Sequence, residues 1–316
     1  MNIVMIGHSN AGKTTYMAAL YKRMSQGIYD YTMRVSVWNM FMRHVCGTYN
    51  NNNEGDFHYS INDAQQEEKD LQLLADQLMR GVYPPSTAIR QYYSFKLQYK
   101  DLEGVNFDWF DYRGGVLVER TSQSSDVEEL NRQISKSDAL LVFIDSTQLV
   151  RFNAEDRRSL RRLVYLVRNA FTKVQQSEEH YFPVSFLLTK DDLCNGNVLE
   201  SQGFRYIDQE LFSEIRESKS IAALLTWITI NKKSILNVHW PLFFSIMHNM
   251  YKFSKEVHDA YQDRAKKRGI FSSIKEYFTD EDKNATNARI KELYDDAQRL
   301  SELIKDAMKE DYLRIY

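Results

Sequence analysis

The stretch GHSNAGKT at Gly7–Thr14 directly follows an apolar run and directly precedes a segment with helical periodicity. It fits the pattern GxxxxGK(S/T), in which glycines let the backbone wrap a phosphate group and consecutive N–H groups point at the anion. The N-terminus of the following helix adds its positive end. Lys13 would reach the β- and γ-phosphates of a nucleotide, and the Thr14 hydroxyl would coordinate Mg²⁺. The predicted nucleotide-binding residues of this stretch are Ser9, Asn10, Ala11, Gly12, Lys13, Thr14 and Thr15.

A second motif, DYRG at Asp111–Gly114, ends the apolar strand predicted at Val105–Phe110. An acid at the C-terminal end of a strand can hold Mg²⁺ through water, and the backbone N–H of the motif's glycine can contact the γ-phosphate. DxxG tetrapeptides are frequent by chance, so the weight of this one comes from its position after the third strand of a P-loop protein. We therefore predict that Asp111 binds the metal and that Gly114 senses the γ-phosphate.

A third motif, TKDD at Thr189–Asp192, closes an apolar run and matches the pattern (N/T)KxD. An aspartate at its last position can accept hydrogen bonds from both the ring N–H and the exocyclic amine of guanine. Adenine lacks this pair of donors, so such a site rejects it by leaving a buried acid unpaired. The motif predicts a guanine site made by Thr189, Lys190 and Asp192, with the aliphatic stem of Lys190 over the base. An acidic turn after a strand is the alternative interpretation, and an ATPase is the function that the motif argues against.

Composition and charge restrict the classes of partner and environment. The chain has 316 residues, 43% hydrophobic and 27% charged, enough for one large domain or two modest ones. Its 41 basic and 43 acidic residues give a net charge of −2, so no nucleic acid is expected as an obligate partner. Cys46 and Cys194 have no metal-ligand spacing. The longest apolar stretch, Ile221–Ile230, is about half of the roughly 20 residues of a membrane helix. We predict a cytoplasmic protein without a transmembrane segment.

Strands alternate with helical segments over most of the chain, which predicts an α/β fold. The predicted strands are Met1–Ile6, Gln91–Tyr99, Val105–Phe110, Leu140–Ile144, Val184–Leu188 and, last, Leu242–Phe244. The short connection between the second and third of these favours an antiparallel pair, whereas the continuous apolar runs are typical of buried parallel strands. The predicted fold class is a P-loop NTPase G domain, with a mostly parallel sheet, one antiparallel strand, helices on both faces and a C-terminal helical extension.

The expected division of the chain is a nucleotide-binding domain at residues 1–250, with an insertion at about 28–80, and a helical extension at residues 251–316. In the extension, apolar residues alternate spacings of three and four over nearly three heptads. They are Ile290, Leu293, Ala297, Leu300, Ile304 and Ala307. This helix is expected to pack on the first domain, and a partner-binding helix is the alternative.

The three motifs, in this order and on these elements, resemble the Ras-like and Era-like translation-factor class of P-loop GTPases over roughly residues 1–250. The resemblance implies a switch I threonine that closes over the γ-phosphate and Mg²⁺. Thr87 in GVYPPST matches the position of this threonine, and Ser86 is the alternative residue for the same role. The resemblance also implies a serine after the last strand, and the backbone of this serine would contact the guanine oxygen. Ser245 is that position, although Ile246 follows it in place of a small residue. The long segment before switch I looks more like bacterial GTPases of paired-GTPase conflict systems.

Two positions bear on hydrolysis. Ras-like enzymes place a glutamine after the DxxG glycine to orient the attacking water, and this chain has Gly115 there. Three explanations stay open: a partner supplies an arginine, Glu119 or Arg120 acts from the same switch, or the protein hardly hydrolyses GTP. Asn10 occupies the position that Era-like, cation-activated GTPases fill with asparagine, which implies stimulation by K⁺. The alternative role of Asn10 is to brace the loop by hydrogen bonding.

The sequence therefore predicts a molecular switch that binds GTP or GDP and hydrolyses the β–γ phosphoanhydride bond of GTP with Mg²⁺. Its predicted catalytic residues are Lys13, Thr87 and Gly114, and its predicted metal ligands are Thr14, Thr87 and Asp111. A non-hydrolysing GTP-binding scaffold or sensor is the alternative. A protein partner or effector is expected to contact the switches or the C-terminal helix.

Overall fold

The computed structural model describes residues 2–25, 31–35, 61–83, 91–99, 105–111, 125–175, 182–195, 197–218, 221–228 and 313–315, with residues 241, 242, 244, 245, 248 and 288. The chain divides into two compact units. The first comprises Met1–Pro241 with Ile315–Tyr316, and the second comprises Leu242–Arg314. The division falls at Pro241, and the domain boundary at residue 250 stays a prediction. Within the described residues, no helix is long and apolar enough to cross a membrane.

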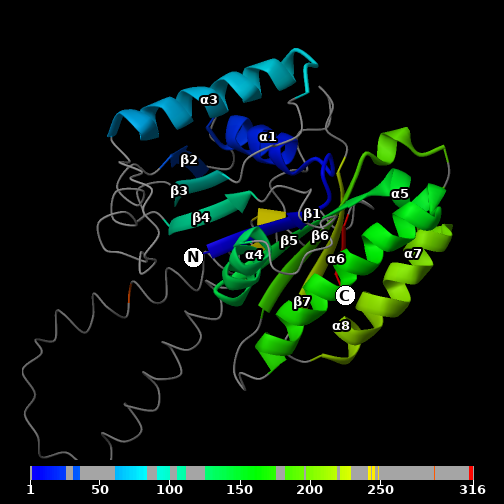
Figure 1. The fold of residues 1–316 in the computed structure, drawn as a ribbon. Helices are drawn as coiled ribbons and strands as arrows, with labels where there is room; N and C mark the ends of the chain where they lie inside the picture. The colour runs from blue at the N-terminus through cyan, green and yellow to red at the C-terminus, as the bar shows by residue number, and fades with distance from the viewer. Residues whose placement is uncertain are drawn as a thin grey trace, which may run out of the picture. The chain divides into compact units, whose positions relative to one another are not determined.

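The first unit is built on a twisted sheet, drawn as arrows in Figure 1. In spatial order its strands are β2 (Tyr31–Val35), β3 (Gln91–Tyr99), β4 (Val105–Asp111), β1 (Asn2–Gly7), β5 (Ala139–Asp145), β6 (Phe182–Thr189) and β7 (Ile221–Ile228). Pairings β4–β1, β1–β5, β5–β6 and β6–β7 are parallel, whereas β3 is antiparallel to both β2 and β4. Among β1 to β7, β3 alone therefore runs against the others, as the sequence predicted. A further short strand, β8 (Leu313–Ile315), lies near the end of the chain.

Helices cover both faces of this sheet (Figure 1). On one side are α1 (Lys13–Ser25) and α3 (Ile61–Met79), and on the other are α4 (Ser125–Ser135), α5 (Ser146–Arg151), α6 (Ala154–Gln175), α7 (Gln202–Ile207) and α8 (Ser213–Glu217). A π-helical turn, Asp208–Phe212, joins α7 to α8. This arrangement is the α/β class that the alternating pattern predicted.

Side chains of the central strands alternate between two buried layers, because successive residues of a strand point to opposite faces. Val4 and Ile6 of β1 belong to the cluster that includes Leu163 of α6. On the α1 side, the ring of Tyr16 packs edge-on against Phe143 at 5.3 Å between centroids and lies 5.9 Å from Trp109. All seven residues of β5 and all eight of β6 are buried, which explains their continuous apolar sequences.

The prediction of a final strand at Leu242–Phe244 is wrong. Leu242 and Phe244 are helical, and the strand that follows β6 is β7, in the run IAALLTWI. The apolar run at 242 follows Pro241, which is itself helical. Proline favours the first turn of a helix, because its fixed φ suits that turn and the missing N–H would have no partner there. The described residues of the second unit before β8, at positions 242, 244, 245, 248 and 288, are all helical.

Candidate functional site

The three sequence motifs meet at one edge of the sheet. Strands β1, β4, β5 and β6 run parallel, so their C-terminal ends lie at the same edge. The register pairs Gly7 with Phe143, and Asp145 with Thr189. Asp111, the last residue of β4, is opposite Met5 of β1. Ligands of open α/β sheets bind outside these carboxyl ends, and the candidate site is therefore here.

The loop between β1 and α1 has the tight backbone that the motif predicts. Asn10 and Gly12 both have positive φ, 62° and 87°, and the N–H of Ala11 donates to the His8 carbonyl at 3.2 Å. Asparagine adopts this left-handed conformation more readily than most residues, so the backbone alone accounts for an asparagine at position 10. A Cβ at Gly7 would lie 2.8 Å from Cβ of Phe143, so no larger residue fits at the start of the loop.

Lys13 begins α1 and lies folded against the loop. Its side chain is buried, and Nζ donates to the carbonyl oxygens of Gly7 and His8, each at 3.0 Å. The ammonium group is thus held beside the backbone that would surround a phosphate. Thr14 and Thr15 follow in the first turn of α1 and are half-buried.

The threonine of TKDD ties the third motif to the first. Thr189 is 3% exposed, and its Oγ1 lies 2.9 Å from the carbonyl oxygen of Ala11 and 3.3 Å from that of Ile144. The Thr189 hydroxyl therefore connects the end of β6 directly to the loop between β1 and α1. Lys190 follows with φ of 58°, a left-handed conformation that turns the chain sharply out of β6.

The two acids of TKDD differ in exposure. Asp191 is half-buried, and burial together with the neighbouring Asp192 raises its pKa above the usual value. Asp192 is exposed and so is available to a ligand, as the predicted role requires. Both lie in a short 3₁₀ turn, Asp191–Leu193.

His8 adds a buried imidazole to the phosphate loop. It is 5% exposed, its Nε2 has no hydrogen-bond partner among the described residues, and burial lowers its pKa despite a hydrogen bond to the backbone of Ser159 in α6. Burial therefore disfavours a positive charge on this ring beside Lys13.

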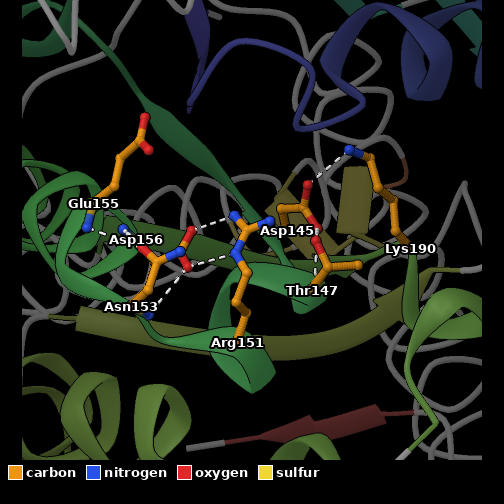
Figure 2. Close-up of polar contacts among 7 residues, drawn as sticks. All are labelled: Asp145, Thr147, Arg151, Asn153, Glu155, Asp156 and Lys190. Atoms are coloured by element: carbon orange, nitrogen blue, oxygen red, sulfur yellow. Dashed lines mark hydrogen bonds and ion pairs between the residues drawn. The ribbon is translucent and has the colours of Figure 1, made fainter.

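Sequence reasoning missed Asp145, the last residue of β5. Its Oδ2 accepts from Nζ of Lys190 at 2.7 Å, and its Oδ1 accepts from the N–H and hydroxyl of Thr147 at 3.0 and 2.6 Å (Figure 2). The signal was available, because Asp145 ends an apolar run just as Asp111 does. Farther along, Arg151 and Asp156 form a second ion pair that joins α5 to α6 (Figure 2).

Several predicted residues lie outside the described part of the chain. These are Ser86, Thr87, Gly114, Gly115, Glu119 and Arg120, and the side chain of Asp111 is likewise undescribed. Ser245 is buried and helical and belongs to the second unit. Its predicted contact with guanine depended on a preceding strand at Leu242–Phe244, which the structure does not have. The position after the last strand of the P-loop sheet begins at Thr229, which is also outside the described residues.

No protein-family model and no curated protein sequence matches this chain. Among solved structures, it is similar to the signal recognition particle receptor SRβ–GTP/SRX complex from Chaetomium thermophilum. Identity is 13% and the TM-score 0.38, over 73% of this chain and 90% of that one. It is also similar to the GTPase-like domain of S. cerevisiae Ski7 bound to GDP and inorganic phosphate. There the identity is 12% and the TM-score 0.34, over 72% of this chain and 43% of that one.

The sheet order, the antiparallel β3 and the loop between β1 and α1 give the chain the mixed α/β fold of a G domain. The strand ends that G domains use for nucleotides carry the GxxxxGK(S/T) and (N/T)KxD residues in this chain.

Proposed function

We propose that this protein is a molecular switch that binds GTP with Mg²⁺ and hydrolyses it. The observation that supports this best is the hydrogen bond from the Thr189 hydroxyl to the Ala11 carbonyl. It joins the strand end with the guanine-selective pattern to the loop with the phosphate-binding pattern. A nucleotide bound with its phosphates on the loop would have its base beside Lys190 and Asp192.

The phosphates would be bound by the loop backbone, the N-terminus of α1 and the Lys13 ammonium. Lys13 already lies against the carbonyls of Gly7 and His8, so a modest rotation of its side chain would bring Nζ to the β- and γ-oxygens. Asp192 would accept the two guanine N–H groups, and the Lys190 stem would cover one face of the base. An adenine ring would leave the Asp192 carboxylate unpaired.

Oxygen donors at this edge fit Mg²⁺, which takes one or two protein oxygens together with phosphate and water. The Thr14 hydroxyl is in the first turn of α1, and Asp111 ends the neighbouring strand β4. The bound ion would neutralise charge that develops on the phosphate oxygens. Thr87 is the proposed third ligand, and with Gly114 it would couple the γ-phosphate to the order of the two switches.

Hydrolysis would proceed by in-line attack of water on the γ-phosphorus. The bond to the β–γ bridging oxygen breaks, GDP leaves, and inorganic phosphate carries away the attacking oxygen. Lys13 and the loop N–H groups stabilise the charge on the transferring group. Because Gly115 offers no side chain to orient the water, the rate depends on K⁺ beside Asn10, on a partner's arginine, or on Glu119 or Arg120. The resemblance to Era-like GTPases and to paired-GTPase conflict systems supports the first two routes.

A non-hydrolysing GTP-binding module is the second candidate, and Gly115 is the residue that favours it. It would use the same phosphate loop and base site, with the nucleotide as a structural or sensory ligand. Recognition by a protein partner through the switches or the C-terminal helix, and a cytoplasmic location, remain predictions in either case.

Phosphate release from GTP and from ATP at saturating Mg²⁺, in KCl and in NaCl, tests the proposal. Turnover of GTP alone supports a GTPase, and faster turnover in KCl supports the role of Asn10. Tight GTP binding without turnover in either salt supports the binding module. Asp192→Asn is the control for the base, because an amide accepts and donates in the pattern that xanthine complements. Equal affinity of the unmodified protein for GTP and ATP would refute guanine selectivity.

A further inference from the structure

The ion pair between Asp145 and Lys190 links two strand ends that the proposed base site shares. Asp145 ends β5 and Lys190 follows β6 directly, and the two strands are in register at Asp145 and Thr189. The Lys190 Nζ lies 2.7 Å from Oδ2 of Asp145. The Asp145 side chain is 11% exposed and that of Lys190 is 33% exposed, so the carboxylate is the more deeply buried partner.

Asp145 is itself held from the opposite side. Its Oδ1 caps α5 by accepting from the N–H of Thr147 and also accepts from the Thr147 hydroxyl. The two carboxylate oxygens therefore have separate partners: one accepts from the first turn of α5 and the other accepts from the Lys190 ammonium (Figure 2). A carboxylate oriented by a helix N-terminus provides a fixed acceptor for an otherwise flexible side chain.

We infer that Asp145 is a positioning residue for base recognition, which it serves by holding the Lys190 side chain in place. This inference depends on the proposed guanine site. A free lysine side chain samples many rotamers, and ordering it over a base opposes binding. With Nζ held by Asp145 before the nucleotide arrives, that ordering is already complete, and the methylene stem is presented as one wall of the site.

The substitution Asp145→Asn should remove the contact with Lys190 and keep the contacts with Thr147, because an amide has one acceptor oxygen and one donor group. Asparagine caps helices as well as aspartate does, so its single carbonyl oxygen can continue to accept from Thr147. The other position becomes an NH₂ group, which cannot accept from the Lys190 ammonium. Lys190→Met removes the same interaction from the other side, because methionine keeps an unbranched apolar stem without the charge.

The experiment measures the dissociation constants of GDP and of inorganic tripolyphosphate for the full chain, by competition against a fluorescent GDP. Tripolyphosphate binds through the phosphate loop and has no base. We expect Asp145→Asn to weaken GDP about tenfold, the cost of ordering one long side chain on binding, and to leave tripolyphosphate unchanged. Lys190→Met should weaken GDP to a similar extent. Adding Asp145→Asn to Lys190→Met should then produce little further loss, because the two residues act through one contact.

Arg168→Gln is the control, since it breaks the ion pairs of α6 with Glu210 and Glu214, and neither Asp145 nor Lys190 takes part in those pairs. It should leave both dissociation constants unchanged. Equal weakening of GDP and tripolyphosphate by Asp145→Asn would overturn the inference in favour of a general structural role. The inference would also be overturned if Asp145→Asn weakened GDP a further tenfold in the Lys190→Met variant. If the unmodified protein binds GDP no better than ADP, the proposed function itself fails, and the inference fails with it.

Discussion

Replacing Thr189 with valine should destabilise the first unit, and replacing Thr226 with valine should not. Both threonines are buried in neighbouring strands, Thr189 at 3% and Thr226 at 0% exposure. They differ in their hydroxyls. Oγ1 of Thr189 lies within hydrogen-bond distance of the carbonyls of Ala11 and Ile144, whereas Oγ1 of Thr226 has no partner among the described residues.

The magnitude follows from the number of bonds that the hydroxyl can make. It has one proton, so it donates fully to one carbonyl at a time, and the shorter contact of 2.9 Å to Ala11 is the stronger. Its loss costs about 1 kcal/mol, and leaving the Ala11 carbonyl with one partner fewer raises the total to about 1–2 kcal/mol. Thr226→Val removes a buried hydroxyl without a partner and should be neutral or stabilising by up to about 1 kcal/mol.

Thermal denaturation monitored by circular dichroism gives the comparison directly. For a domain of this size each kcal/mol shifts the midpoint by roughly 2–4 °C, so Thr189→Val should melt several degrees below Thr226→Val. GDP should also bind more weakly to Thr189→Val, because the phosphate loop loses its connection to β6. Equal melting points for the two variants, or a lower one for Thr226→Val, would refute the reasoning.

Three further outcomes follow from individual contacts. Gly203→Ala should destabilise the first unit by about 2 kcal/mol in urea denaturation, because a Cβ there would lie 2.5 Å from the Leu149 carbonyl oxygen. Asp156→Asn should cost about 2 kcal/mol at neutral pH, because it weakens the charge-assisted hydrogen bonds from Arg151. Because Arg151 lowers the pKa of this buried carboxylate, the difference from the unmodified protein should disappear as pH falls below 3.8 and through the lowered native value. The unmodified protein should also lose stability as pH falls from 6.5 through the lowered pKa of His8, because unfolding then takes up a proton. His8→Gln should lack this component in a pH series of denaturant titrations.

The central strands could be predicted from sequence because both faces of a parallel sheet are covered. That burial requires apolar residues at consecutive positions, and β1, β5 and β6 show it without interruption. The antiparallel pair β3–β4 was predictable for another reason, the shortness of its connection. β2 carries no such signal, because Tyr31–Val35 is a short edge strand with an arginine in its sequence.

β7 was missed although its sequence is among the most apolar in the chain. The apolar stretch Ile221–Ile230 is too short for a membrane helix, and the length and burial of β7 within it are those of a core strand. The sequence pattern instead predicts the last strand at the three apolar residues Leu242–Phe244. Periodicity cannot separate a strand from a helix over so short a run, and the preceding Pro241 was the better guide.

In the candidate site, contacts between residues close in sequence could be predicted, whereas contacts between residues far apart in sequence could not. The tight loop between β1 and α1 could be predicted because a contiguous motif determines the conformation of consecutive backbone groups. The contact between Thr189 and Ala11 joins residues 178 positions apart, so it is visible only once β6 and β1 are known to end at one edge. Strand order then extends the prediction to a residue outside every motif. A polar side chain that ends a buried parallel strand faces the same edge, and β5 lies between β1 and β6. The carboxylate of Asp145, at the end of β5, therefore lies between the two motifs. A buried acid at that position needs a cation, and Lys190 supplies it.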